Sequence, residues 1–306
     1  MSRAGGHPDV RPPAGRQGPG PVPASRVEAL DLVIARRAGG VLPGERPAPG
    51  VGAGLELAQL RPYQPGDDVR RLDPAATART GMPHVRLQVP ERLLTTWLVL
   101  DLSPSMAFGT ADRLKSDVAD GAVSVIGRLA TRRGGRVGLL TCGAPVQRVL
   151  PPQSGRGVLA ALRRVIDEGV AADGTEPAAT LADTLTRLGR TARQPGLVVV
   201  VSDMRGPMDW TGPLRRLAAR HSVLCVEVFD PREGALPAVG QLRLVDPETG
   251  RQIEVDTGSA RLRERYADAE RSRRDALADE LRRAGADHLA LSTEGQWLRE
   301  LGRRLR

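Results

Sequence analysis

Apolar and polar positions follow two different periods between residue 93 and the C-terminus. The segments LLTTWLVLDLS (93–103) and GLVVVVSDM (196–204) are almost continuously apolar, which is typical of parallel strands buried on both faces. Residues 111–132 instead carry apolar side chains three and four positions apart, which predicts a helix with one buried face. From residue 93 on, the chain therefore alternates buried strands with amphipathic helices.

The same two patterns recur along the rest of the chain. Further strands are predicted at 136–143, 222–231 and 288–293, and further helices at 156–169, 177–192, 211–221, 259–284 and the C-terminus. Two hairpins interrupt the alternation: residues 146–152 are predicted to pair with the preceding strand, and residues 241–256 fold back around a turn at 247–250. Strands that alternate with helices predict an α/β fold with a doubly wound, mostly parallel sheet flanked by helices.

The N-terminal part of the chain lacks this regular alternation. Residues 1–24 are rich in Pro and Gly, which predicts a disordered tail. A short helix is predicted at 25–39, and the segment 41–89 predicts turns and short strands with too little apolar sequence for a core of its own. We therefore expect a tail at 1–24, a helix plus a small β-rich extension at 25–92 and one large α/β domain at 93–306.

Composition argues against several classes of protein. The chain has 45 basic and 36 acidic residues, a net charge of +9 and only 2% aromatic residues. Its arginines are interspersed with acids, and few rings are available to stack on bases, so nucleic-acid binding is disfavoured. No apolar stretch approaches the roughly 20 residues of a membrane helix, and no signal-peptide pattern is visible. Cys142 and Cys225 lie in apolar runs and are predicted to be buried thiols. We expect a cytoplasmic protein without a membrane span.

Oxygen-bearing side chains gather where predicted strands end. Asp101, Ser103 and Ser105 alternate directly after the first strand, and an extended turn would aim all three at one point. Asp203 ends the most β-branched strand in the same way, and Thr175 lies in a loop before a helix. In doubly wound sheets, ligands bind where the loops after the strands converge. Two carboxylates and three hydroxyls are hard donors suited to Mg²⁺ (or Mn²⁺), so these five residues are predicted to hold one such ion.

Other interpretations of these residues stay open. Ser103 and Ser105 precede a predicted helix and could act only as helix caps. A metal-dependent phosphoester hydrolase could instead use Asp101 and Asp203 as ligands, provided that a base lies near a metal-bound water. Against catalysis, the sequence has no G-x-S-x-G elbow and no G-x-x-x-x-G-K phosphate loop, and its only lysine, Lys115, lies in a predicted helix. We therefore expect a binding module rather than an enzyme.

The pattern D-x-S-x-S, followed by a later Thr loop and a later Asp loop, resembles the metal-ion-dependent adhesion site of von Willebrand factor A domains. The segments YQPGDDVRRLD, TAR, DLSPSMAFG and VDPETG, with Glu91, together resemble the bacterial family called domain of unknown function 58, from about Gly39 to the C-terminus. The sequence departs from that family at Pro74, where the family usually has tryptophan, so this loop is expected to pack differently.

The resemblance carries expectations about fold and partner. It implies a von Willebrand factor A-like domain with a small N-terminal extension, acting as an adaptor in a chaperone-like or assembly role. It also implies a protein partner whose Asp or Glu completes the metal shell. Proteins of the resembled family are often encoded beside MoxR-type AAA+ ATPases, so such an ATPase is the expected partner.

The charged segment PGDDVRRLD (65–73) allows two interpretations. Asp67, Asp68, Arg70 and Arg71 form either a partner-binding face or ion pairs that fix the extension, and we favour ion pairs. Trp97, inside the first strand, is predicted to be a core residue.

Overall fold

The computed structural model describes residues 57–88, 94–109, 112–132 and 134–305. These residues form two compact units, one within Glu45–Leu93 and one that begins at Leu94. The predicted tail at 1–24 and the predicted helix at 25–39 lie outside the described residues, so the division of the chain into three parts stays a prediction. Within the described ranges, none of the helices combines the length and the apolar content of a membrane span.

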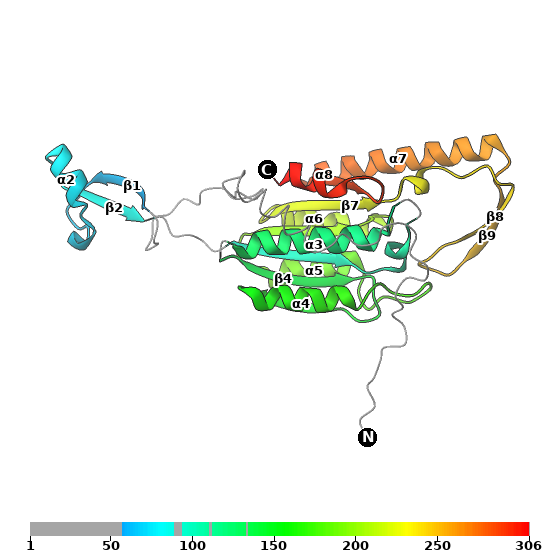
Figure 1. The fold of residues 1–306 in the computed structure, drawn as a ribbon, viewed down its shortest axis with the longest axis horizontal. Helices are drawn as coiled ribbons and strands as arrows, with labels where there is room; N and C mark the ends of the chain where they lie inside the picture. The colour runs from blue at the N-terminus through cyan, green and yellow to red at the C-terminus, as the bar shows by residue number, and fades with distance from the viewer. Residues whose placement is uncertain (1–56, 89–93, 110–111, 133, 306) are drawn as a thin grey trace, which may run out of the picture. The chain divides into compact units, whose positions relative to one another are not determined.

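A six-stranded sheet forms the centre of the larger unit (Figure 1). Its strands lie in the order β10 (Asp287–Ser292), β7 (Ser222–Phe229), β6 (Leu197–Ser202), β3 (Thr95–Asp101), β4 (Arg136–Cys142) and β5 (Val149–Gln153). Neighbouring strands are parallel except for β5, which pairs with β4 in the antiparallel hairpin predicted from the sequence. The predicted doubly wound, mostly parallel sheet is confirmed, and it is the fold that the resemblance to von Willebrand factor A domains implies.

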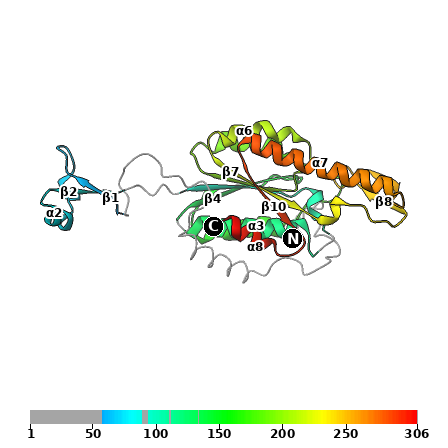
Figure 2. The same ribbon diagram turned by 90° about the horizontal axis from the view of Figure 1, so that it is seen from above.

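Helices cover both faces of this sheet, as Figure 2 shows for α3 and α8 on one face and for α6 and α7 on the other. The first face carries α3 (Lys115–Arg132), α4 (Arg156–Asp167) and α8 (Trp297–Arg304). The second face carries α5 (Leu181–Thr191), α6 (Thr211–Ala218) and α7 (Ala260–Ala284). Both faces of the central strands are therefore buried, which explains why their sequences are apolar without alternation.

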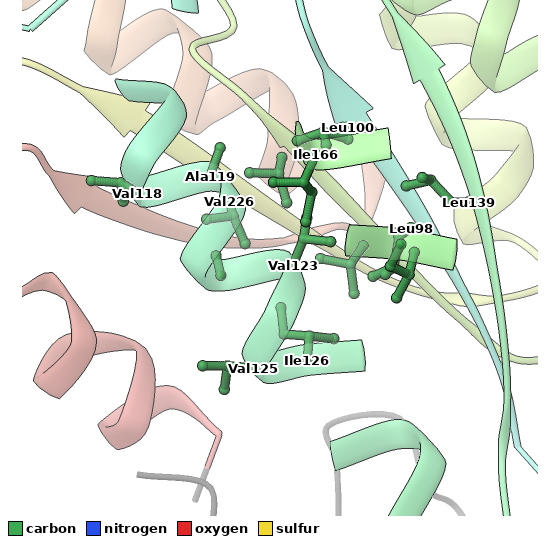
Figure 3. Packing of buried hydrophobic residues seen from close by; sticks show 14 of the residues in the cluster. Leu98, Leu100, Val118, Ala119, Val123, Val125, Ile126, Leu139, Ile166 and Val226 are labelled. Carbon is green, nitrogen blue, oxygen red and sulfur yellow. The ribbon is translucent and has the colours of Figure 1, made fainter. Parts of the chain in front are cut away.

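Two hydrophobic cores lie on opposite sides of strand β3. Leu98 and Leu100 belong to the core shared with α3, and Figure 3 shows them in one cluster with Val123 and Ile126 of that helix. Trp97 belongs to the other core and is buried, as predicted. Cys142 and Cys225 are buried thiols that form no disulfide, which is also as predicted.

Helix α3 begins at Lys115, four residues later than the predicted start at residue 111. The N–H of Leu114 donates to the carboxylate of Asp117 at 3.1 Å, and the N–H of Lys115 donates to the carbonyl of Phe108 at 2.8 Å. Residues 112–114 are non-helical, and these bonds place Lys115 at the start of the helix. The apolar period alone did not reveal this local cap.

A separate hairpin, β8 (Gln241–Val245) and β9 (Gln252–Asp256), connects β7 to α7. Its turn lies at the predicted position, where Gly250 adopts a positive φ of 70° that other residues rarely adopt. Helix α7 follows, capped by the hydroxyl of Ser259, which accepts the N–H of Leu262. Both the hairpin and the long helix are confirmed.

The smaller unit is an antiparallel hairpin of β1 (Leu57–Pro62) and β2 (His84–Gln88) with the short helix α2 (Pro74–Thr80) and the turn η1 (Val69–Arg71). Pro74 is the first residue of α2, where its missing N–H costs nothing, and Asp73 caps that helix. Asp67 pairs with Arg61 at 2.7 Å, and Asp68 accepts the N–H of Arg70. Both acids therefore stabilise turns within this unit.

Candidate metal centre

The order of the strands reverses between β3 and β6, and we call the place where the loops after these two strands diverge the crevice. The connection from β3 passes through α3 on one face of the sheet, whereas the connection from β6 passes through α6 on the other face. The two loops therefore diverge at the carboxyl ends of these neighbouring strands, which is where open α/β sheets bind ligands. Asp101 is the last residue of β3, and Asp203 directly follows β6. The tertiary structure thus places the two predicted acids at the same crevice.

The carboxylate of Asp101 is almost completely buried, with 8% of the residue exposed. Its Oδ1 accepts the N–H of Ser103 at 2.9 Å, and its Oδ2 accepts the hydroxyl of Ser202 at 2.6 Å. Burial and the nearby charge of Asp203 raise the pKa of Asp101 to about 6, although both hydrogen-bonding serines oppose this shift. A desolvated carboxylate that faces a second negative charge is a favourable place for a cation.

Ser103 and Ser105 approach each other through a tight turn. The turn is the 3-10 helix η2 (Pro104–Ala107), so the extended turn expected from the sequence is wrong, but the two Oγ atoms still lie 3.1 Å apart. Ser103 stands at the N-cap position of η2, yet its hydroxyl makes no capping bond. The capping interpretation therefore does not account for this pair of hydroxyls.

Gly143 leaves room for this turn. Its φ of +77° favours glycine, and a Cβ placed on it would lie 2.7 Å from Oδ1 of Asp101 and 2.6 Å from Cβ of Ser103. The end of β4 thus approaches the end of β3 too closely for any side chain at this position.

Asp203 accepts hydrogen bonds from Lys115, Arg205 and Ser105. Its Oδ2 accepts Nζ of Lys115 at 2.7 Å, and its Oδ1 accepts the N–H of Arg205 at 3.1 Å. Burial by itself would raise the pKa of this carboxyl, but the Lys115 ammonium and the hydrogen bonds, one of them from Ser105, hold the pKa below its ordinary value. Asp203 is therefore an ionised group whose orientation is fixed.

Lys115 is the functional side chain that the sequence pattern did not identify. Its Nζ is fully buried and also donates to Oε1 of Glu233 at 2.7 Å, in the 3-10 turn η4 (Pro231–Gly234). Burial opposes the charge on Lys115, but the two carboxylates outweigh it and raise the pKa of the ammonium. In the sequence, Lys115 stood out only as the single lysine, because every other basic residue except the histidines is arginine.

Thr175 lies on a loop that is anchored beside the cluster. The N–H of Ala171 donates to the carbonyl of Leu102 at 2.8 Å, and the N–H of Gly174 donates to the carbonyl of Pro247 at 2.8 Å. Thr175 itself is half-buried and donates its N–H to Ala172. Among the described residues, no hydrogen bond joins its hydroxyl to the other four predicted ligands. The structure therefore unites Asp101, Ser103, Ser105 and Asp203, and Thr175 lies on a neighbouring loop that we call the rim of the site.

These residues fit a hard divalent cation. The donors are carboxylate and hydroxyl oxygens, which suit Mg²⁺ or Mn²⁺ rather than ions that prefer thiolate or imidazole. Within the described ranges, no three acidic, histidine or cysteine side chains converge as a ready metal cage. An ion at this site would accordingly depend on the serine hydroxyls and on water as well as on the carboxylates.

A further carboxylate reaches the site from the β8–β9 hairpin. Oε1 of Glu248 accepts the N–H of Ser105 at 3.1 Å. Burial, together with the charges of Asp101, Asp203 and Glu248, raises the pKa of the Cys142 thiol. All three carboxylates therefore act on the same part of the crevice.

The two histidines that the structure describes in the larger unit lie on the β7 and β10 side of the sheet, away from β3. His221 directly precedes β7, at the amino end of that strand and opposite the edge that carries Asp101. His288 lies on the edge strand β10, which β7 and β6 separate from β3, and its Nε2 lies 3.0 Å from Oε2 of Glu227. Among the described residues, no hydrogen bond joins either imidazole to the clustered acids and serines.

Proteins of similar sequence occur in mycobacteria. "Uncharacterized protein Rv1480" of Mycobacterium tuberculosis is 39% identical over 304 residues, which cover 96% of this chain and 93% of that protein. "Uncharacterized protein Mb1516" of Mycobacterium bovis gives the same figures. "Uncharacterized protein MAV169" of Mycobacterium avium is 40% identical over 125 residues, which cover 40% of this chain and 72% of that protein.

Two solved structures and one protein family are also similar to this chain. The conserved hypothetical protein BatB from Bacteroides thetaiotaomicron is 13% identical, with a TM-score of 0.46, over 69% of this chain and 96% of that chain. The SpRpn10 VWA domain is 14% identical, with a TM-score of 0.37, over 68% of this chain and 93% of that chain. The family described as "Protein of unknown function DUF58" matches residues 59–276, which include both acids of the crevice. With this match and the full-length mycobacterial relatives, the chain belongs to the DUF58 family.

Proposed function

We propose that this chain is a metal-dependent protein-interaction module whose binding site is the crevice between β3 and β6. The observation that carries the proposal is the pair of buried acids, Asp101 and Asp203, beside two hydroxyls 3.1 Å apart at a strand-order reversal. Lys115 balances the charge of Asp203, whereas the donors to Asp101 among the described residues are neutral, so a bound cation would stabilise the ionised form of Asp101. Ser103 and Ser105 supply the neutral oxygens that such a cation needs.

The residues of the crevice have separate roles in this proposal. Asp101, Ser103 and Ser105 would hold Mg²⁺ (or Mn²⁺), with Thr175 at the rim as a further oxygen donor. Asp203, whose two oxygens already accept Lys115 and a backbone N–H, would mainly orient the shell and add negative charge. The bound ion supplies a positive centre for an Asp or Glu of a protein partner.

A MoxR-type AAA+ ATPase is the partner that we propose. This step rests on the family: its members are often encoded beside such ATPases, and that association implies a complex in which this chain is an adaptor. An acidic residue of the ATPase would meet the cation at the carboxyl edge of the sheet. Removing one member of a desolvated charge pair costs about 2 to 5 kcal/mol of binding free energy, which converts micromolar binding into binding too weak to detect.

The direct test is binding between the purified chain and a purified MoxR-type ATPase from the same genome. We expect binding in millimolar Mg²⁺ and its loss in EDTA, in Asp101→Ala and in Ser105→Ala. Asp275→Ala is the matched control, because Asp275 is an exposed acid on α7. Equal binding in Mg²⁺ and in EDTA would refute the metal-dependent contact and would direct attention to the segment 63–71 of the smaller unit.

The alternative function, a metal-dependent phosphoester hydrolase with Asp101 and Asp203 as ligands, has its own readout. We expect no phosphatase, esterase or nucleotidase turnover above background in Mg²⁺ or Mn²⁺, because His221 lies at the opposite edge of the sheet and His288 lies on β10, which two strands separate from β3. Metal-dependent turnover that disappears in Ser103→Ala would favour the hydrolase instead.

A further inference from the structure

The β8–β9 hairpin brings an acidic side chain to the crevice from a distant part of the sequence. Glu248 lies 143 residues from Ser105, and its Oε1 accepts the Ser105 N–H at 3.1 Å. Next to it, the carbonyl of Pro247 accepts the N–H of Gly174 on the loop that carries Thr175. The tip of the hairpin thus contacts two of the loops that carry the proposed ligands. Figure 1 shows the hairpin at one end of the central sheet.

The tip is rigid in itself. The carboxylate of Asp246 accepts the N–H of Glu248 at 3.0 Å and the hydroxyl of Thr249 at 2.6 Å, and its carbonyl accepts the N–H of Gly250 at 2.8 Å. At the base of the hairpin, the N–H and the hydroxyl of Thr257 both donate to the carbonyl of Gly240 at 2.7 Å. These bonds fix where Glu248 stands relative to the two strands.

The attachment of the hairpin to the sheet is weaker. Strands β8 and β9 pair only with each other, as a two-stranded sheet apart from the central one. An isolated hairpin of this kind is marginally stable in water, so its position depends on the contacts at its tip. Two single hydrogen bonds contribute little net free energy, because water replaces them when they break, so they can be broken without unfolding the domain.

We infer that Glu248 is an internal carboxylate of the proposed metal centre, which stands in the place of the partner's acid until a partner displaces the hairpin. This inference rests on the proposed function. Glu248 has the properties that a partner's Asp or Glu would need. It is negatively charged, it contacts Ser105 and it is exposed at the rim of the site. The hairpin then makes the site selective, because only an acidic partner that competes successfully with Glu248 can bind.

The experiment uses Mn²⁺ alone as the probe and compares four proteins: wild type, Glu248→Gln, Glu254→Gln and Asp101→Ala. Glu254→Gln is the matched control, because it removes the same charge from an exposed position of the same hairpin. Mn²⁺ affinity is measured by titration calorimetry. We expect Glu248→Gln to weaken Mn²⁺ binding by about tenfold to a hundredfold, the usual effect of removing a group that supports a metal site. Glu254→Gln should match wild type.

Hydrogen exchange gives a second readout that does not depend on affinity. In wild type and in Glu254→Gln, Mg²⁺ should slow exchange of the amides of Ser105, of Asp246 and of residues 248–250, since Pro247 has no amide hydrogen. In Glu248→Gln, these amides should exchange faster in EDTA and should gain no protection from Mg²⁺. Equal Mn²⁺ affinity and equal protection in Glu248→Gln and Glu254→Gln would overturn the inference.

The outcomes separate this inference from the proposed function. If Mn²⁺ binds equally to wild type and Glu248→Gln but not to Asp101→Ala, the metal centre stands and the internal carboxylate is refuted. If Mn²⁺ binds to none of the four proteins, the proposed metal centre is refuted, and the role of Glu248 falls with it.

Discussion

The Asp101 carboxylate combines burial, a neighbouring like charge and two hydrogen-bond donors. Because its pKa is raised to about 6 from an ordinary value of 3.8, the folded state without metal binds more protons than the unfolded state between these pH values. Without metal, the free energy of unfolding should therefore fall as pH rises from about 4 to about 6. A cation would reverse this loss by balancing the charge.

Asp101→Asn tests this balance. In EDTA at pH 7.5, we expect the variant to be more stable than wild type by about 1 kcal/mol, because the repulsion with Asp203 is gone. In Mg²⁺ at about 100 times its dissociation constant, wild type should gain roughly 2.7 kcal/mol and the variant nothing. Thermal melts with Asp275→Asn as control measure both effects. A purely structural Asp101 would instead give a variant that is less stable in EDTA and unchanged in its response to Mg²⁺.

The burial of His221, away from the crevice, should make the free energy of unfolding depend on pH. Burial is the main cause that lowers the pKa of this imidazole, the charge of Arg220 adds to it, and the Ala192 backbone opposes it. The folded state therefore disfavours the charged form, and its stability is complete above about pH 6.5 and declines as pH falls below that value.

His221→Leu should remove this part of the acid sensitivity. We expect protonation of His221 to lower the free energy of unfolding of wild type by at most about 1 kcal/mol between pH 6.5 and 5.5. In the variant, the free energy of unfolding should change less over the same pH range. Urea denaturation at several pH values provides the measurement. Parallel profiles for the two proteins would show that His221 is not responsible.

At the scale of elements, the contact between α3 and α8 depends on a glycine. A Cβ on Gly121 of α3 would lie 2.3 Å from the ring of Trp297 in α8. Gly189 in α5 offers the opposite case, because a Cβ there would meet Leu217 at an ordinary distance of 3.9 Å. The same substitution should therefore have opposite effects in the two helices.

We expect Gly121→Ala to destabilise the domain by about 1 to 3 kcal/mol, since Trp297 must shift in a packed core. Gly189→Ala should stabilise it by about 0.5 to 1 kcal/mol through helix propensity. Chemical denaturation of both variants gives the two values. A stabilising Gly121→Ala would mean that α8 is not packed on α3 as the structure has it.

At the scale of the whole molecule, charged groups form a chain of contacts from the crevice to α7. Lys115 joins Asp203 to Glu233, and Arg205 lies 3.7 Å from Glu233 and pairs with Glu270 of α7 at 2.7 Å. These groups come from α3, η4, α7 and the loop after β6. The network therefore ties the candidate site to the longest helix of the described chain.

Lys115→Met removes the buried cation of this network, so that Asp203 loses its ammonium partner and Glu233 keeps only the more distant Arg205. We expect a loss of about 3 to 5 kcal/mol in the free energy of unfolding, the usual consequence of breaking a buried ion pair. Lys115→Arg, which keeps the charge, should lose less. Denaturation in EDTA measures both variants, and an unchanged stability of Lys115→Met would show that the network is dispensable.

The sequence by itself determined the elements and the donors. The central strands are continuously apolar because both of their faces are buried, and each helix has apolar residues at helical spacing because one of its faces is buried. These local patterns predicted the strands and helices of the larger unit and its two hairpins. Asp101, Ser103, Ser105 and Asp203 were identified because each lies at or just after a strand end, and in a parallel sheet those ends share one edge.

Only the tertiary structure decided which of these residues meet. The order of strands places β3 beside β6 and hence Asp101 beside Asp203, although 101 and 203 are far apart in the chain. It also aims Lys115 at Asp203 and brings Glu248 to Ser105. A sequence pattern reports whether a position is buried, because burial repeats with the local period. It does not report which distant charge a buried charge will face, because that depends on how the completed sheet brings remote loops together.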